Sequence, residues 1–312
     1  MRAFIFPGQG SQSVGMGRAL ADASAVARAV FQEVDDALGQ HLFKLMTNGP
    51  DDQLFLTENA QPAIMANAIA TLRVLEQEGG MTLASSASFV AGHSLGEYTA
   101  LCAAGVFDLA TTARLLKLRG AAMQAAVPVG IGAMAALLGA GVDAAQTLAD
   151  AVAQGEVCTI ANDNDPAQVV ISGHLGAIER AIAGAKDHGF KRGIMLPVSA
   201  PFHCPLMQPA ADAMAQALGD HPPRAPLVPI FANVTAAPVS TPADIARLLV
   251  EQVTARVRWR ESVAAMEAAG VEHFIEFGGK VLGPMVKRSA VGEVGVVSVV
   301  TMDDVEAVAK AL

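Results

Sequence analysis

The sequence predicts an α/β protein with a mainly parallel sheet and a small inserted subdomain of ferredoxin-like topology. Two patterns lead to this prediction. In the first and last thirds of the chain, short runs typical of buried strands alternate with helix-type segments, as at residues 3–6 and 88–91. In the middle third, strands and helices follow the order β-α-β-β-α-β, which is the ferredoxin-like signature.

The individual elements follow from local patterns. A strand is expected at 3–6, before a helical stretch that runs through residue 38, and another at 88–91, before a helix from residue 95. The inserted segment should contain strands at 133–138, 157–162, 169–172 and 191–196 and helices at 143–153 and 175–188. Beyond it we expect a strand at 228–232, helices at 242–253 and 259–269, and a strand at 273–277. We therefore place a large α/β catalytic domain at 1–128 and 197–312 and the small subdomain at 129–196.

Composition excludes several classes of protein. Hydrophobic residues make up 52% of the 312 residues, so a long disordered region is not expected. The net charge of -9 argues against a nucleic-acid-binding protein, which would need a clustered basic face. Three scattered cysteines, Cys102, Cys158 and Cys204, match neither a disulfide framework nor the CxxC spacing of a metal site. We expect no metal and a reducing compartment.

The sequence predicts neither a secretory signal nor a membrane-spanning segment. The N-terminal strand is interrupted at once by Pro7 and Gly8, unlike a secretory signal. The longest apolar run, residues 131–142, is shorter than the roughly 20 residues that a membrane span needs. A cytoplasmic location is expected.

The sharpest local signal is the sequence Gly-His-Ser-Leu-Gly at residues 92–96. It lies between a strand-type run and a helix-forming segment, which is the context of a nucleophile elbow. The glycines allow a tight turn that presents the Ser94 hydroxyl at a helix N-terminus, where developing negative charge is favoured. Ser94 is therefore the candidate nucleophile; the alternative is a helix-capping serine.

A serine needs a base to accept its proton, and His203 is the candidate among seven histidines. It follows a predicted strand in a loop restricted by Pro201 and Pro205. A structural loop histidine is the alternative, and His93 is expected to shape the elbow instead. Because Asp212 is the only nearby acid in sequence and lies in a following helix, a backbone carbonyl is expected to orient the imidazole in a Ser-His dyad.

The glycine-rich turn at residues 7–12 follows the first strand. It lacks the Lys-Ser/Thr ending of a P-loop and the third glycine of a dinucleotide fingerprint. We favour an oxyanion hole, in which the amides of Gln9 and Leu95 face the tetrahedral intermediate. An ordinary glycine turn and a phosphate-binding loop are the alternatives.

Arg119 interrupts an apolar helix face. At 100° per residue, it falls in the middle of the stripe formed by Leu115, Leu116, Ala122 and Met123. A buried guanidinium is costly without an anion. Either an internal acid pairs with Arg119, or its planar fork binds a substrate carboxylate in a bidentate manner.

Together these segments resemble the malonyl-CoA:acyl carrier protein transacylases over essentially the whole chain. The resemblance rests on residues 6–12, 92–98, 119–120, 132–136, 168–173 and 196–203. It implies an α/β-hydrolase-like core with a ferredoxin-like subdomain. It also implies that Ser94 carries the malonyl ester, that His203 is base and then acid, and that Arg119 grips the malonyl carboxylate.

Further roles follow from the resemblance alone. Gln252 would orient the histidine through its carbonyl, Asn162 would line the acyl cleft, and His93 would lie among the substrate-binding residues. Phe202 and Leu95 match the malonyl-selective versions of these motifs, and a bulky ring would disfavour methylmalonyl by about 1 to 3 kcal/mol. One departure is the segment at residues 276–280, Glu-Phe-Gly-Gly-Lys, which is one residue shorter than usual and puts that loop's geometry in question.

The resemblance implies a ping-pong transfer of malonyl from malonyl-CoA to the phosphopantetheine thiol of acyl carrier protein, in fatty acid biosynthesis and without a cofactor. Because carrier proteins are acidic, we expect a local basic surface, with two pairs as candidates: Lys191 with Arg192, and Lys287 with Arg288. A monomer is expected. The alternatives are loading for polyketide synthesis or for a malonate decarboxylase, a serine esterase or thioesterase, and a non-catalytic carrier-protein scaffold.

Overall fold

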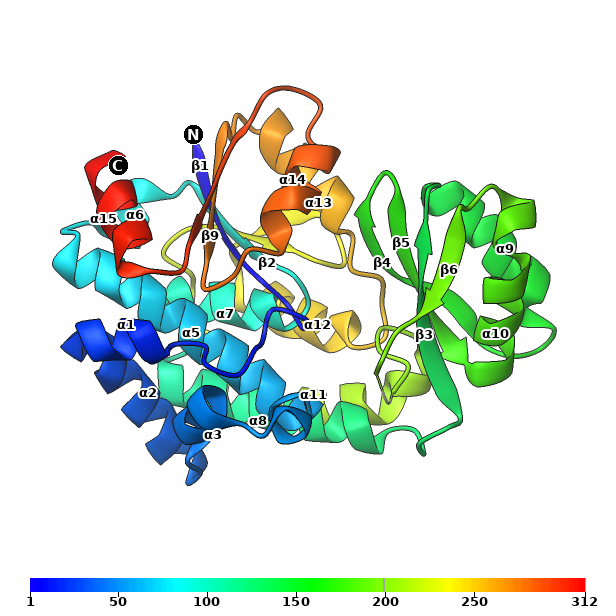
Figure 1. Cartoon of the computed structure of the whole chain (residues 1–312), viewed down its shortest axis with the longest axis horizontal. Helices are drawn as coiled ribbons and strands as arrows, with labels where there is room; N and C mark the ends of the chain where they lie inside the picture. The colour runs from blue at the N-terminus through cyan, green and yellow to red at the C-terminus, as the bar shows by residue number, and fades with distance from the viewer. Residues whose placement is uncertain (199, 312) are drawn as a thin grey trace.

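The larger of two sheets confirms the predicted fold class (Figure 1). A computed structural model describes residues 1–198 and 200–311; Ser199 and Leu312 lie outside the described residues. The large sheet has the order β10-β9-β1-β2-β7-β8, and every neighbouring pair is parallel except β7 with β8. Its strands are β1 (Arg2–Phe6), β2 (Phe89–Gly92), β7 (Ile230–Ala232), β8 (Ala237–Val239), β9 (His273–Phe277) and β10 (Gly295–Val299).

The central strand β1 is buried on both faces. Phe4 and Phe6 point to one side of the sheet, where both rings pack against Phe277 with centroids 4.9 and 5.7 Å apart. Ala3 and Ile5 point to the other side, into a second cluster that contains Trp259. Parallel sheets are covered on both faces, so such a strand is a continuous apolar run rather than an alternating one.

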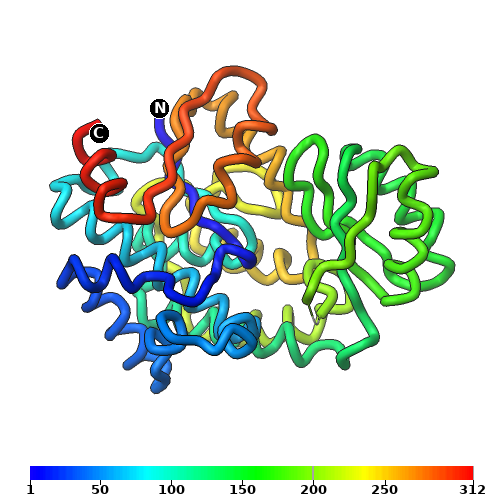
Figure 2. Tube along the Cα trace, viewed as in Figure 1, coloured from blue at the N-terminus to red at the C-terminus, as the bar shows by residue number. Residues whose placement is uncertain are grey.

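The smaller sheet has ferredoxin-like topology. Its four strands are antiparallel in the order β4-β5-β3-β6, so the first strand in sequence lies between the third and the fourth. The chain reaches this sheet after α8 and returns after β6 (Figure 2). The predicted helix 175–188 ends at Gly184, and a short 3-10 turn continues it. The elements are β3 (Gly132–Leu138), α9 (Val142–Ala153), β4 (Cys158–Asp165), β5 (Gln168–His174), α10 (Leu175–Gly184) and β6 (Arg192–Met195).

The two faces of the smaller sheet have different neighbours. Ala135, Leu137 and Ile171 pack under the helices α9 and α10. Met134, Ala136 and Val170 point the other way and join the main core of the molecule. The cleft described below therefore has the antiparallel sheet as one wall.

The long helix α5 (Thr57–Glu78) was not predicted. It packs against α2, α7, α8 and α15, and 17 of its 22 residues are buried. A helix buried almost all round shows no amphipathic period, so periodicity could not find it. The remaining helices are α1 (Arg18–Ala23), α2 (Ala25–Leu38), α3 (Leu42–Asn48), α4 (Asp51–Leu54), α6 (Leu83–Ser86), α7 (Leu95–Ala103), α8 (Leu109–Ala125), α11 (Gln208–Asp220), α12 (Pro242–Gln252), α13 (Trp259–Ala268), α14 (Leu282–Ser289) and α15 (Met302–Ala311).

Candidate active site

Ser94 lies in a strained turn between β2 and α7. Its backbone angles, φ 54° and ψ -111°, are rarely adopted by a residue with a side chain and cost about 1–3 kcal/mol. A Cβ atom on Gly92 would lie 1.9 Å from the carbonyl oxygen of Gly96, and one on Gly96 would lie 2.2 Å from that of Phe6. Both glycines are therefore required for β2 and α7 to meet this closely. The turn places the Ser94 hydroxyl at the N-terminus of α7.

His203 meets this hydroxyl from a loop more than a hundred residues away in sequence. Its Nε2 lies 2.7 Å from Ser94 Oγ, and its Nδ1 lies 2.9 Å from the backbone oxygen of Gln252. Because a carbonyl only accepts, Nδ1 carries the proton and Nε2 is left to accept one. Burial and, secondly, the charge of Arg119 lower the pKa of His203 to about 3, so the ring is neutral near pH 7.

Arg119 is 1% exposed and lies beside the same hydroxyl. Its Nη2 donates to Ser94 Oγ at 3.2 Å and to Gln252 Oε1 at 2.8 Å, and its Nη1 donates to Gln61 Oε1 at 2.8 Å. Within residues 1–198 and 200–311, these hydrogen bonds reach neutral oxygen atoms only, and Nε has no partner. Of the two interpretations left open by the sequence, the structure therefore excludes a direct pair with an internal acid of the described chain.

A cavity of about 260 Å³ opens over these three side chains. Gln9 and Gly10 of the glycine-rich turn form one side of it, and Leu196, Pro197 and Val198 form another. The turn lies against the elbow because the amide of His93 donates to the carbonyl of Phe6 at 3.1 Å. Of the nine predicted site residues, eight line this cavity: Gln9, His93, Ser94, Leu95, Arg119, Asn162, Phe202 and His203. Gln252 lies behind Arg119.

Comparison with known proteins gives the family. Residues 3–282 match the model of the acyl transferase domain. The chain belongs to the acyl transferase family. It is 45% identical over 287 residues to the malonyl CoA-acyl carrier protein transacylase of Escherichia coli K12, covering 92% of each chain. It is 42% identical over 288 residues to the Bacillus subtilis 168 protein of the same name, covering 92% of this chain and 89% of the relative. The resemblance inferred from the motifs is confirmed, and the protein is an acyltransferase.

Solved structures agree with this assignment. The acyl-carrier-protein-S-malonyltransferase of Bartonella henselae superposes on the acyltransferase with a TM-score of 0.96 and 50% identity, covering 99% of this chain and 98% of that one. A malonyl-transacylase in complex with a type II PKS acyl-carrier protein superposes with a TM-score of 0.95 and 39% identity, covering 100% and 99%. The α/β fold with its second, antiparallel sheet is thus shared with these structures.

The His93 ring of the acyltransferase lies against β4 and Trp259. Its Nε2 lies 2.8 Å from Asn164 Oδ1, and its ring lies 5.9 Å from that of Trp259. Burial lowers the pKa of His93, so this imidazole is also neutral. His93 therefore links the elbow to β4, the strand that also places Asn162 on the wall of the cavity.

Sequence analysis missed three buried polar residues of the acyltransferase site. Asn233 Oδ1 accepts from the Ser94 amide at 2.8 Å, and its Nδ2 donates to the Gly92 carbonyl at 2.7 Å. Glu97 and Gln61 contact Gln252 and Arg119, respectively. Glu97 stands three residues after the nucleophile on an otherwise apolar helix start, which is a usable signal; Asn233 and Gln61 have none in their own segments.

The shortened segment at residues 276–280 has a structural role. The buried carboxylate of Glu276 accepts from the amides of Val281, Leu282 and Gly283 at 2.8 to 3.0 Å and so caps α14. A Cβ on Gly279 would lie 2.9 Å from Pro7 Cγ, so this loop also supports the glycine-rich turn. The loop packs closely in its shorter form.

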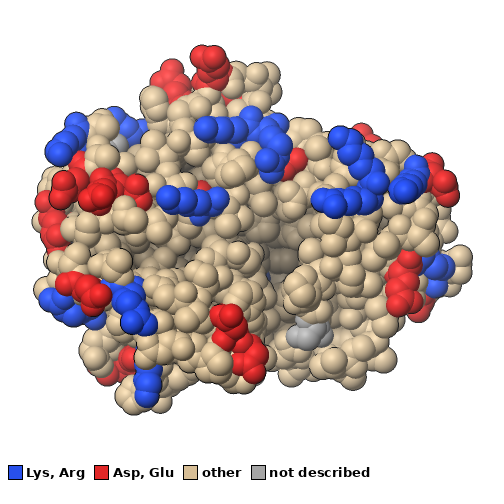
Figure 3. All heavy atoms as spheres, viewed as in Figure 1, with Lys and Arg blue, Asp and Glu red and all other residues tan. Residues whose placement is uncertain are grey.

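The four basic residues named above are exposed. Arg288 already has a partner within the chain, because its Nε donates to the buried Asp165 carboxylate at 2.8 Å. Lys and Arg side chains gather over the upper half of the face shown in Figure 3, on both sides of its central hollow. The net charge of -9 is therefore unevenly distributed.

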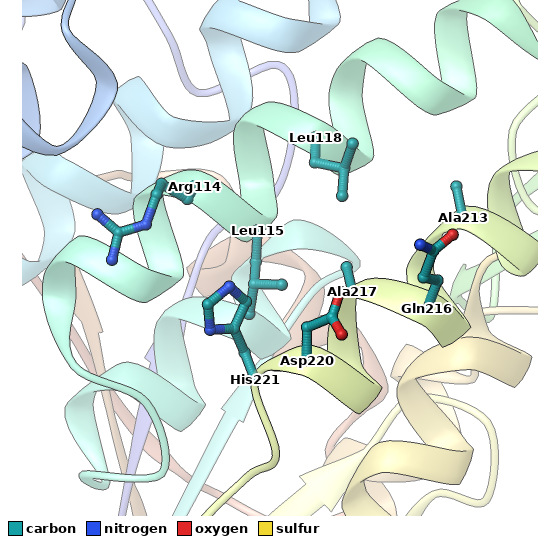
Figure 4. A pocket seen from close by; sticks show the side chains of 8 residues that line it. All are labelled: Arg114, Leu115, Leu118, Ala213, Gln216, Ala217, Asp220 and His221. Carbon is teal, nitrogen blue, oxygen red and sulfur yellow. The ribbon is translucent and has the colours of Figure 1, made fainter.

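A separate pocket of about 320 Å³ lies between α8 and α11 (Figure 4). Arg114, Leu115 and Leu118 of α8 line it, so α8 presents Arg119 to the active site and Arg114 to a different surface. None of the predicted site residues contributes to this second pocket.

The described residues offer neither a cluster of metal ligands nor a membrane-spanning helix. No three His, Cys, Asp or Glu side chains among them are grouped in a way that could hold a metal ion. None of the helices in the described part of the chain is both long and apolar enough to cross a bilayer.

Proposed function

We propose that this acyltransferase transfers the malonyl group of malonyl-CoA to the phosphopantetheine thiol of acyl carrier protein, for fatty acid biosynthesis. The observation that carries the proposal is Arg119, a buried guanidinium 3.2 Å from the nucleophile whose own hydrogen bonds reach only neutral oxygen atoms of the described chain. An acyl group with a distal carboxylate would supply the missing anion. Two relatives named as malonyl CoA-acyl carrier protein transacylases support this substrate.

The reaction proceeds in two transfers through Ser94. Ser94 Oγ attacks the thioester carbonyl while His203 Nε2 takes its proton, and the amides of Gln9 and Leu95 stabilise the oxyanion. The C–S bond then breaks, and His203 returns the proton to the CoA sulfur. In the second transfer the carrier thiol gives its proton to His203 and attacks the malonyl ester, and Ser94 Oγ regains a proton from the ring. The residues supply every proton transfer, so we propose no cofactor and no metal.

Substrate selection rests on the walls of the cavity. Arg119 holds the malonyl carboxylate, and Asn162 and His93 line the acyl cleft. Phe202 and Leu95 restrict the space beside the ester, which disfavours an α-methyl branch. Gln252 holds His203 through its carbonyl and Arg119 through its side chain.

An acidic carrier protein would approach the basic part of the face in Figure 3. Lys191, Arg192, Lys287 and Arg288 are the proposed contacts, and a structural relative solved with an acyl-carrier protein supports this kind of partner. The protein is proposed to act in the cytoplasm as a monomer. Residues 129–196 are proposed as the small subdomain, and residues 1–128 and 197–312 as the catalytic domain.

The test is mass spectrometry after brief mixing with malonyl-CoA. We expect an adduct of about 86 Da on the peptide that contains Ser94, because the acyl-enzyme accumulates without a thiol acceptor. The Ser94→Ala variant should show no adduct, and acyl carrier protein should discharge the wild-type adduct. Rapid release of CoA without any adduct would indicate a hydrolase, and unchanged function in Ser94→Ala would indicate a non-catalytic scaffold.

A further inference from the structure

A second buried ionisable group, the carboxyl of Glu97, lies under the active site, on α7. Burial raises the pKa of Glu97 to about 7, against the opposing effect of its hydrogen bond from Gln252. Glu97 is 3% exposed, and its Oε2 accepts hydrogen bonds from Gln252 Nε2 at 2.7 Å and from the Asn233 amide at 3.1 Å. Its hydrogen bonds reach neither the Ser94 hydroxyl nor Arg119. A buried carboxylate is costly to keep, and nothing in the two acyl transfers uses it directly.

The amide of Gln252 lies between the Arg119 guanidinium and the Glu97 carboxyl. Arg119 can only donate, so Gln252 must turn its Oε1 toward the guanidinium, at 2.8 Å. Its Nε2 then faces the other way and donates to Glu97 Oε2 and, more weakly, to the backbone oxygen of Ser94 at 3.1 Å. A flipped amide would place an NH2 group against the guanidinium and an oxygen against the carboxylate. The acceptor at Glu97 therefore selects the productive orientation.

The same geometry keeps the two charges from pairing directly. If Glu97 reached Arg119, the carboxylate would occupy the fork that a substrate carboxylate needs. With one amide interposed, the ionised form of Glu97 lowers the cost of the buried guanidinium, and in either form Arg119 keeps Nε without a partner in the described chain and Nη2 against the nucleophile.

We infer that Glu97 is a positioning residue for substrate selection: through the Gln252 amide it holds the Arg119 fork in place beside Ser94, without touching the substrate. The inference rests on the proposed function and assigns a role to a side chain outside the cavity lining. Its specific consequence is that the preference for malonyl over acetyl depends on where the acceptor atom at position 97 lies.

Two conservative variants separate acceptor position from charge. Glu97→Gln keeps an oxygen within reach of both donors but removes the charge, and Glu97→Asp keeps the charge but withdraws the acceptor by one methylene. We expect Glu97→Asp to lower the malonyl-to-acetyl ratio of kcat/KM by roughly tenfold or more and Glu97→Gln to stay within about threefold of wild type. Both substrates use Ser94 and His203, so damage to the elbow alone would cancel in this ratio.

Two controls complete the test. Glu76 is a partly buried carboxylate that accepts from the Leu83 amide at 3.1 Å, far from the cavity, and Glu76→Gln should leave the ratio unchanged. In an Arg119→Ala background, Glu97→Asp should have no further effect on the malonyl-to-acetyl ratio, because the guanidinium that Glu97 positions is absent. The opposite order of the Gln and Asp variants, equal losses in both, or no loss in either would overturn the inference. A wild-type protein without malonyl preference would contradict the proposed function instead.

Discussion

Truncation of Arg119 is the sharpest test of how the site selects its acyl group. In Arg119→Ala the malonyl carboxylate would enter a buried cavity whose remaining polar neighbours, Gln61 and Gln252, turn their acceptor oxygens toward it. Removing one partner of a buried charge pair costs about 3–5 kcal/mol, of which part is relieved by water that fills the vacated volume. We therefore expect kcat/KM for malonyl-CoA to fall by roughly 10² to 10³-fold.

Acetyl-CoA provides the internal reference for this prediction. Acetyl has no distal carboxylate, so its kcat/KM should change by less than about tenfold, and the preference for malonyl should disappear. Steady-state transfer to acyl carrier protein with both thioesters measures the two values. Arg114→Ala is the matched control, because Arg114 lies on the same helix but lines the pocket of Figure 4. Equal losses for malonyl and acetyl would refute the assigned role and show that Arg119 supports the fold or the dyad instead.

Three other outcomes are expected. The pKa of His203, lowered to about 3, keeps the base neutral throughout the mildly acidic range. The rate of Ser94 acylation should therefore show no decline near pH 6.5 and should fall only as the pH approaches 3. Stopped-flow measurement of adduct formation gives this rate, and a decline with a midpoint near pH 6.5 would contradict the prediction. Gly96→Ala should lower the melting temperature by several degrees or prevent folding, since its Cβ would lie 2.2 Å from the Phe6 carbonyl oxygen; an unchanged calorimetric transition would show that the turn can open. Phe202→Ala should raise the methylmalonyl-to-malonyl ratio of kcat/KM by roughly 5- to 100-fold, and an unchanged ratio would place the steric restriction elsewhere.

Features within one continuous segment were predictable from the sequence. The elbow could be found because strand, glycine turn and helix follow one another in fifteen residues. The buried position of Arg119 followed from the period of α8, and the four strands of the small sheet followed from alternating segments of regular length. These features depend on backbone-angle preferences, on glycine in tight turns and on hydrophobic periodicity. Each of these acts over a few residues, so it can be recognised in the sequence without knowledge of the tertiary structure.

The partners of those residues depended on the tertiary structure. The family resemblance implied the Gln252 carbonyl as the partner of His203, whereas the residues themselves indicated a carbonyl only in general terms. No local pattern connects that ring with residue 252, and only the end of α12 at this loop brings them to 2.9 Å. Asn233 and Gln61 were missed for the same reason, because a single amide in a strand end or a helix has no period. Helix α5 was missed because burial on nearly all sides removes the amphipathic pattern.

What the sequence alone determined was therefore the chemical inventory: a hydroxyl on an elbow, an imidazole in a proline-bounded loop and an arginine on an apolar face. Whether Arg119 pairs with an internal acid was decided only by packing, which interposes the Gln252 amide between it and Glu97. A buried charge must be compensated, but chain connectivity does not say by which group or across how many atoms. That choice is made where α7, α8 and α12 meet, by distances that no stretch of local sequence encodes.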